Sequence, residues 1–529
     1  MDESKVPSAV SKMTAGVTVS ARIAGLALLS QFASMRWLVL FFLTFTLSTW
    51  AQESEEPDTT TDQAQEEEPT QGTVDDSVTI DGQQIDYTVT ASKLTLKKDD
   101  DTPQADIFYV SYIRKNVGPD SVRPILFAFN GGPGSSAVWL HLGALGPKIV
   151  QTSPDGTEAL PPPVLLQDNP LSILDVTDLV FIDPVSTGYS RKDKDAKNSD
   201  FHGVSADINS VADFIRRWVT ENDRWNSPKF LLGESYGGIR AAGLSTRLQD
   251  RYGMSLNGVV LLSSLLDFRT LRPGEGDFID SIIFLPVMTA TAHYHGKISG
   301  DRDQLITRSN TFAKGPYATA LLQGNELPEE EISRVSEELS TLTGVPAQLW
   351  KESHLRLSPS RFRRELLRDQ DKVIGRFDSR VAWPARNNNS DYPSFDPSYA
   401  VAHGAFSTAM LDFLSRTLSY EETRPYEILT GNVHPWNYGK GNSYVNLTSD
   451  LATALLENPN LKVLVQCGRT DLATPPQGML YSLRQAYLPK SSQDRITVEW
   501  YDAGHMFYLN QPDLEKMRTD LVQFIRQTP

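Results

Sequence analysis

The segment around Ser235 constrains the fold of this chain more than any other. An apolar run at residues 229–232 leads into the turn Gly233-Glu234-Ser235-Tyr236-Gly237-Gly238, and residues 239–242 then favour a helix. This order predicts a buried strand that turns sharply into a helix, because small flanking residues permit a strained backbone at the serine. The serine hydroxyl would project beside the positive end of the new helix, so we predict that Ser235 is a nucleophile. A glycine turn that merely closes a strand is the alternative.

A second glycine-rich segment follows residues 123–129, which we predict to form a strand. It reads Asn130-Gly131-Gly132-Pro133-Gly134-Ser135-Ser136. A backbone with so few side chains can approach a reacting carbonyl group, so the amide hydrogens of Gly132 and Tyr236 would form an oxyanion hole. A loop without a ligand and a phosphate-binding loop are the alternatives. No Gly-Lys-Ser or Gly-Lys-Thr sequence follows, which argues against a nucleotide-binding P-loop.

Two strand-like stretches late in the chain each lead into a loop with a candidate catalytic side chain. Residues 461–466 precede Asp471, and residues 496–501 precede His505. A histidine can accept the serine proton and return it later, while an aspartate fixes the imidazole tautomer. The order serine, acid, histidine is the order found in α/β-hydrolases, so we predict the triad Ser235, Asp471 and His505. Asp267, which follows a predicted strand, is the alternative acid.

Strand-like and helix-like stretches alternate along much of the chain. Residues 178–183 have the pattern of a strand, and residues 204–221, 475–487 and 512–527 have the pattern of helices. Alternation of polar and apolar residues between 77 and 115 predicts antiparallel strands at the start of the sheet. We therefore predict an α/β-hydrolase fold with a mostly parallel central sheet, helices on both of its faces and a helical cap insertion.

The composition of the N-terminal region differs from that of the rest. Residues 1–51 form a predicted N-terminal extension with an export signal, because Met35 and Arg36 precede an apolar run at 37–47. Residues 52–72 contain many acids and few apolar side chains, which predicts a disordered linker. We expect an exported protein, periplasmic or extracellular, with no stable membrane partner. An uncleaved membrane anchor is the alternative, and the pattern leaves the oligomeric state open.

The remaining chain divides into three predicted parts. The hydrolase core would comprise residues 73–266 and 461–529. Residues 267–460 break the rhythm of the sheet with charged helical segments, so we predict a mainly helical cap that narrows access to Ser235. The single cysteine, Cys467, predicts a fold without an internal disulfide.

The overall charge excludes one class of partner. The chain of 529 residues carries a formal net charge of -16 at pH 7. Proteins that bind nucleic acid need clustered Lys and Arg side chains to neutralise phosphates, so we expect no nucleic-acid partner.

With these motifs assembled, the chain resembles the serine carboxypeptidase family of α/β-hydrolases, and in particular its disulfide-free bacterial branch. The resemblance rests on the two glycine-rich segments, on residues 183–190, on the Asp471 loop and on Gly504-His505-Met506. It implies that Ser235, Asp471 and His505 are the triad and that Gly132 and Tyr236 form the oxyanion hole. It also implies that Asn130 with Glu234 grips the free C-terminal carboxylate of a peptide substrate.

The resemblance implies an exported serine peptidase that hydrolyses peptide bonds at peptide C-termini through an acyl-enzyme, without a metal ion or cofactor. A carboxylate meets Glu234 favourably only if the two acids share a proton. The chain departs from the family pattern at Ala144, which stands where the family carries a second glutamate, and at Ala128, where it carries tryptophan. An esterase or acyltransferase that uses the same triad is the alternative.

Overall fold

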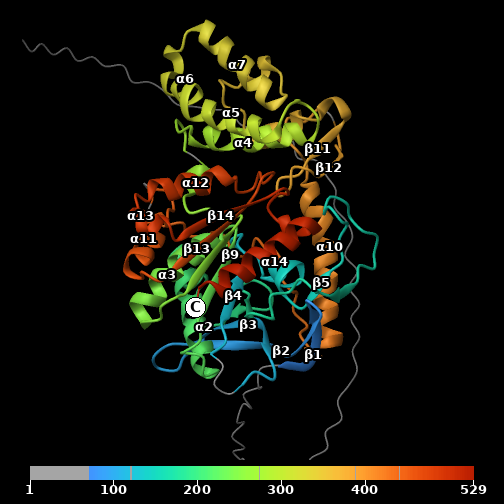
Figure 1. Cartoon of the computed structure of the whole chain (residues 1–529), viewed down its shortest axis with the longest axis vertical. Helices are drawn as coiled ribbons and strands as arrows, with labels where there is room; N and C mark the ends of the chain where they lie inside the picture. The colour runs from blue at the N-terminus through green and yellow to red at the C-terminus, as the bar shows by residue number, and fades with distance from the viewer. Residues whose placement is uncertain are drawn as a thin grey trace, which may run out of the picture. The chain divides into compact units, whose positions relative to one another are not determined.

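The central sheet occupies the middle of the described part of the chain (Figure 1). The computed structural model describes residues 71–118, 122–272, 274–387, 389–439, 441 and 443–528. The predicted export signal and all but the last two residues of the predicted linker lie outside these ranges. No helix within the described residues is long and apolar enough to cross a lipid bilayer.

Ten strands form this sheet in the order β1-β2-β3-β7-β4-β9-β10-β13-β14, with β8 paired to β3. The strands nearest β1 pair in antiparallel fashion, whereas every pair from β7 to β14 is parallel. The predicted mostly parallel sheet with antiparallel strands at its start is therefore confirmed. The strands are β1 (Gly72–Ile80), β2 (Gln83–Lys97), β3 (Pro103–Arg114), β4 (Ile125–Phe129), β7 (Asp178–Ile182), β8 (Arg191–Lys192), β9 (Lys229–Glu234), β10 (Gly258–Leu262), β13 (Lys462–Gly468) and β14 (Ile496–Tyr501).

Helices cover both faces of the sheet because its central strands are apolar on both sides. In β4, Leu126 and Ala128 join the core of one face, whereas the alternate residues Ile125, Phe127 and Phe129 join the core of the other face. The helices of the first face are α1 (Val138–Leu140), α10 (Pro397–Asp412) and α14 (Gln511–Arg526). Those of the second are α2 (Val204–Glu221), α3 (Gly237–Tyr252), α11 (Thr448–Glu457) and α12 (Pro476–Gln485), with α13 (Lys490–Gln493) close by in the chain.

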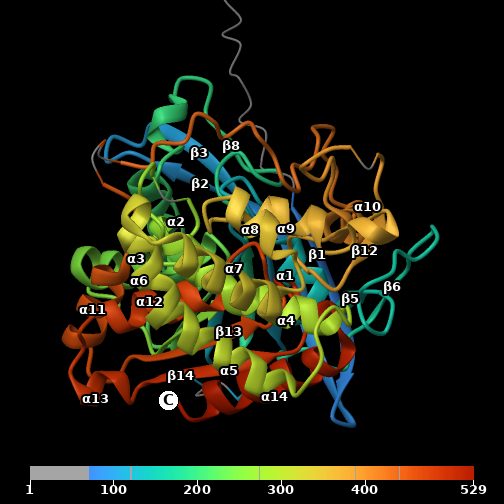
Figure 2. The same cartoon turned by 90° about the horizontal axis from the view of Figure 1, so that it is seen from above.

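A separate group of helices lies over one end of the sheet (Figures 1 and 2). It has an apolar core of its own, formed mainly by side chains between Phe284 and Ile374. Its elements are α4 (Ile279–Tyr294), α5 (Arg302–Phe312), α6 (Ala318–Gln323), α7 (Glu329–Thr343), α8 (Ala347–Glu352), α9 (Pro359–Glu365), β11 (Lys372–Ile374) and β12 (Ala382–Pro384). The strands β5 (Lys148–Val150) and β6 (Leu166–Asp168) form a small sheet of their own, separate from the main sheet.

We call this separate group of elements the insertion. It is smaller than the range 267–460 that the sequence predicts for the cap. Helices α10 and α11 fall inside that range, yet their apolar side chains pack into the two cores of the sheet. At the other boundary, β1 begins at Gly72, the last residue of the predicted linker. The exposed faces of cap helices and of core helices carry the same kinds of charged residues, so the sequence pattern did not separate the two groups.

A buried ion pair fixes the start of α3, the helix that follows Ser235. The Arg240 guanidinium is 1% exposed and donates two hydrogen bonds to Asp207 in α2, at 2.9 and 3.1 Å. It donates a third, at 2.7 Å, to the carbonyl oxygen of Asn130. One side chain therefore connects the helix after the serine, the neighbouring helix and the glycine-rich loop.

We expect Arg240→Met to lower the free energy of unfolding by about 3–5 kcal/mol, because Asp207 would be left buried and unpaired. Urea denaturation followed by circular dichroism would measure this loss. In the double variant with Asp207→Leu the loss should be smaller than the sum of the two single losses. Strict additivity would contradict the proposed coupling between the two side chains.

Candidate active site

Ser235 lies at the turn between β9 and α3 with a left-handed backbone, at a φ of 62°. Its amide donates to the carbonyl oxygen of Leu262 in β10 at 3.1 Å. The turn is tight: a Cβ atom at Gly233 would lie 2.1 Å from the carbonyl oxygen of Gly237. The glycines at 233 and 237 therefore allow the strained turn that the sequence predicts, and Ser235 lines a cavity above the sheet.

His505 and Asp471 form a buried pair at the ends of neighbouring strands. The Nδ1 atom of His505 lies 2.8 Å from Oδ2 of Asp471, and the two side chains are 2% and 1% exposed. The other carboxylate oxygen accepts hydrogen bonds from the amides of Ala473 and Thr474, at 2.7 and 2.9 Å. With Asp471 fixed by these bonds, the Nε2 atom of His505 is the nitrogen left for proton transfer.

Thr474 is a second contact of the imidazole that the sequence reasoning missed. Its hydroxyl lies 2.9 Å from Nδ1 of His505 and 2.8 Å from Oδ2 of Asp471. It is also 2.5 Å from the carbonyl oxygen of Ser263. One hydroxyl proton serves one of these acceptors at a time, so Thr474 holds the Asp471 loop against the strand end after β10.

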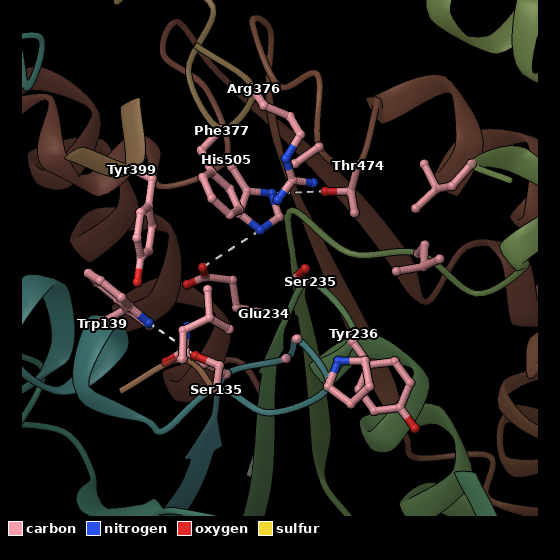
Figure 3. Close-up of a pocket in the computed structure, with 18 of the residues that line it drawn as sticks. Ser135, Trp139, Glu234, Ser235, Tyr236, Arg376, Phe377, Tyr399, Thr474 and His505 are labelled. Carbon is pink, nitrogen blue, oxygen red and sulfur yellow. Dashed lines mark hydrogen bonds and ion pairs between the residues drawn. The ribbon is translucent and has the colours of Figure 1, made fainter. Parts of the chain in front are cut away.

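The charge of His505 depends on two carboxyl groups. Burial lowers the pKa of the imidazole, but the charges of Asp471 and Glu234 raise it, and the net pKa lies above its ordinary value. The Nε2 atom is 3.9 Å from Oε1 of Glu234 (Figure 3). Within the described residues, the hydroxyl of Ser235 makes no hydrogen bond to His505, although both groups line the same cavity.

Asn130 and Glu234 lie together beside the triad. Asn130 lies beside Glu234 and lowers its pKa, and the side-chain oxygen of Asn130 accepts a hydrogen bond from the amide of Leu140 at 3.3 Å. Burial raises the pKa of Glu234 to about 7. The structure thus brings the two predicted carboxylate-binding residues to one place, with a glutamate that retains a proton near neutral pH.

Tyr508 completes this group and was not found from the sequence. Its hydroxyl donates to Oε2 of Glu234 at 2.8 Å. Tyr508 belongs to a short 3-10 turn at Phe507–Leu509, three residues after His505. The only sequence signal was this proximity to His505, because 274 positions separate the tyrosine from the glutamate that it contacts.

The two predicted oxyanion-hole donors face the cavity from adjoining segments. Gly132 and Tyr236 both line it, and within the described residues neither amide hydrogen has a backbone acceptor. A Cβ atom at Gly131 would lie 2.4 Å from the amide nitrogen of Tyr236. Glycine at 131 therefore lets the loop lie against the turn without a side chain in front of that amide.

The cavity has a volume of about 360 Å³ and takes its walls from the core and from the insertion (Figure 3). Phe377, which follows β11, accepts a hydrogen bond from the backbone amide of His505 at 2.6 Å, and the two rings are 5.2 Å apart. The other side chains that line it and were not predicted include Trp139, Leu265, Phe268, Leu271, Arg272, Arg376, Tyr399, Leu429, His434 and Met506.

Two other sequence candidates lie elsewhere. Asp267 accepts hydrogen bonds from the Arg269 amide and from Asn446, at 2.8 and 3.1 Å, and lines a separate polar pocket. Ala144 is 2% exposed and is absent from the lining of the active-site cavity. Its carbonyl oxygen accepts a hydrogen bond from Asn169 at 2.8 Å. Of the two acids weighed for the triad, Asp471 is the one in contact with His505.

Comparisons with known proteins bear on the family of this chain. The chain matches the family model of the serine carboxypeptidases over residues 96–510. It is 27% identical to the lysosomal protective protein of Mus musculus over 191 residues, which make up 36% of this chain and 35% of that relative's length. The solved structure of Kex1(Δ)p, a prohormone-processing carboxypeptidase from Saccharomyces cerevisiae, matches at 15% identity and a TM-score of 0.52, covering 83% of this chain and 91% of the other, which establishes the α/β-hydrolase fold. Since the family model spans most of its length, the chain belongs to the serine carboxypeptidase family.

Proposed function

We propose that this protein is a serine carboxypeptidase, which removes residues from the free C-terminus of a peptide. The observation that carries the proposal is that two groups of side chains meet in one cavity. Ser235 and His505 supply the chemistry of acyl transfer, while Asn130 and Glu234 supply hydrogen bonds for a carboxylate beside them. A substrate carboxylate held there would lie one residue beyond the bond that Ser235 attacks.

The reaction would proceed through an acyl-enzyme. Nε2 of His505 accepts the proton of the Ser235 hydroxyl while Oγ attacks the carbonyl carbon of the last peptide bond. The amide hydrogens of Gly132 and Tyr236 stabilise the oxyanion. His505 then protonates the departing amino group, and the terminal residue leaves. A water molecule, deprotonated by His505, attacks the acyl-enzyme and releases the shortened peptide.

Glu234 would bind the terminal carboxylate in its protonated form. Two carboxyl groups at hydrogen-bonding distance share one proton, because two negative charges would repel one another. Burial already raises the pKa of Glu234 to about 7. The protein therefore needs no strongly acidic medium to keep this proton, and carboxylate binding weakens as the pH rises through this value.

Site of action is a second part of the proposal. The apolar run at 37–47 favours export, and the mouse relative carries the name of a lysosomal protein. We propose that the chain acts on peptides outside the cytoplasm.

The nucleophile can be tested directly. We expect Ser235→Ala to lower kcat for a blocked dipeptide by about 10⁵–10⁶, since loss of the nucleophile removes covalent catalysis. Hydrolysis assays on a peptide with a free C-terminus, on its C-terminal amide and on an ester would be run for both proteins. Equal turnover of the peptide and its amide would contradict the carboxypeptidase proposal, and turnover of the ester alone would favour an esterase or acyltransferase.

Glu234→Gln tests the shared proton. In the wild type, Glu234 loses its proton as the pH rises through about 7, so KM for a peptide with a free carboxylate should rise there. Glutamine donates from its amide at every pH, and KM of the variant should stay nearly constant over the same range. Steady-state kinetics at several pH values separate KM from kcat, on which His505 also acts. If KM of the variant rises with pH as it does in the wild type, Glu234 is excluded as the titrating group.

Tyr508→Phe provides the matched control, because it leaves Glu234 in place. The hydrogen bond from Tyr508 lowers the pKa of Glu234, opposing the effect of burial. Without that bond Glu234 should keep its proton to higher pH, so the rise in KM should move upward on the pH axis. A downward movement, or no movement, would show that Tyr508 does not act through Glu234.

A further inference from the structure

Two guanidinium groups in the active-site cavity have no part in the acyl-transfer steps. Arg272 follows the 3-10 turn Phe268–Thr270, and Arg376 follows β11 of the insertion. Both line the cavity that contains Ser235. Burial lowers the pKa of Arg376, the charges of Asp396 and Asp471 oppose this, and the nearby charge of Arg272 lowers it further. Two separate segments therefore present like charges to one cavity, which is unfavourable unless an anion comes between them.

The protein itself neutralises these cations only weakly. Arg376 stacks on the ring of Phe377, 4.3 Å from its centroid, and among the described residues its ion pair with Asp396 is long, at 3.8 Å. The charge of Asp471 also acts on Arg376. The neighbouring Arg380 is bound to Asp378 at 2.7 Å and is 7% exposed, whereas the side chain of Arg376 is 46% exposed. Within the described residues, the side chain of Arg272 makes no ion pair or hydrogen bond. Both charges are therefore available to a ligand.

Among the described residues that line the cavity, Glu234 is the one with a carboxyl group. Tyr508 donates a hydrogen bond to Glu234, and Asn130 lies beside Glu234 and lowers its pKa. Figure 3 places Arg376 beside His505 and Thr474, and Glu234 on the other side of the imidazole. A substrate carboxylate bound at Glu234 would thus leave the two arginines free for a second negative group.

The second negative group would lie on the acyl side of the scissile bond. Arg272 and Phe268 both line the cavity, and the amide of Arg272 donates to the carbonyl oxygen of Phe268 at 2.9 Å. The ring of Phe268 is 6.2 Å from the ring of Tyr236. Tyr236 comes directly after Ser235, and Figure 3 shows Tyr236 and Glu234 on different sides of that serine. A peptide that places its terminal carboxylate at Glu234 and its carbonyl at Ser235 would direct the preceding side chain toward this part of the cavity.

We propose that Arg272 and Arg376 bind the carboxylate of an acidic side chain in the residue whose carbonyl is attacked, and so make the enzyme prefer substrates with Asp or Glu at that position. Guanidinium groups hold carboxylates by paired, charge-assisted hydrogen bonds. This inference rests on the proposed acyl-enzyme chemistry of Ser235. It assigns specificity to two residues that do not take part in the bond changes.

The test compares blocked substrates that differ only in Glu or Gln at the acyl-side position. For the wild type, kcat/KM should be about 10- to 100-fold higher with Glu, the size expected of a charged hydrogen bond. In the double variant Arg272→Gln and Arg376→Gln this ratio should fall close to one, mainly through loss of activity on Glu. The single variant Arg376→Glu should favour Lys over Glu. Arg416→Gln, which removes the same charge from a residue outside the cavity, should leave the ratio unchanged.

Each substrate is made both as a peptide with a free C-terminus and as an alkyl ester of the same acyl group. The ester has no terminal carboxylate, so its Glu to Gln ratio reports the arginine pair even if the carboxypeptidase proposal fails. If the wild type cleaves Gln peptides and its kcat/KM is no higher for Glu peptides, the inference about the arginines is wrong, while the carboxypeptidase proposal stands. Equal losses on Glu and Gln substrates in the double variant would also overturn it, because the arginines would then serve the terminal carboxylate or the fold.

Discussion

The left-handed backbone of Ser235 is the constraint on which the site depends. It projects the hydroxyl from the carboxyl end of a parallel strand, and it persists because Gly233 and Gly237 leave room for the turn. Arg240, one turn into the next helix, ties that helix to Asp207 and to the loop at Asn130. Close packing at the turn and the buried ion pair between Arg240 and Asp207 therefore maintain the strained backbone of Ser235. The same contacts set where the amides of Gly132 and Tyr236, the predicted oxyanion-hole donors, lie.

Asp471, Glu234 and His505 are buried together in the site but have different surroundings. Asp471 accepts hydrogen bonds from two amides, and its other carboxylate oxygen contacts His505. Glu234 is equally enclosed, but burial raises its pKa to about 7, so it can carry a proton. His505 lies between them, with Nδ1 toward the first and Nε2 toward the second. One imidazole thus lies between the acid of the predicted triad and the glutamate that we propose binds the substrate carboxylate.

The sequence identified the polar groups that lie in short, unusual motifs. Gly233 to Gly238, the loop from Asn130 and the segment around His505 are each recognisable from a few adjacent residues, because backbone geometry at a sharp turn restricts the side chains that fit. The structure places all of them at one cavity. Tyr508 and Thr474 escaped this reasoning, since they contact Glu234 and His505, which are distant from them in the chain. Arg272 and Arg376 escaped it because only the folded chain brings their two segments to one cavity. The extent of the insertion escaped it for the same reason.

By itself, then, the sequence determined the alternation of buried strands and helices, the turn at Ser235 and the order of serine, acid and histidine, all of which follow from local periodicity and local sterics. Only the tertiary structure decided that Asp471 rather than Asp267 contacts His505, that Tyr508 bonds to Glu234, and that α10 and α11 belong to the core. These outcomes depend on which strand ends and loops are neighbours in space. That is set by the packing of the whole sheet and its layers rather than by any single segment.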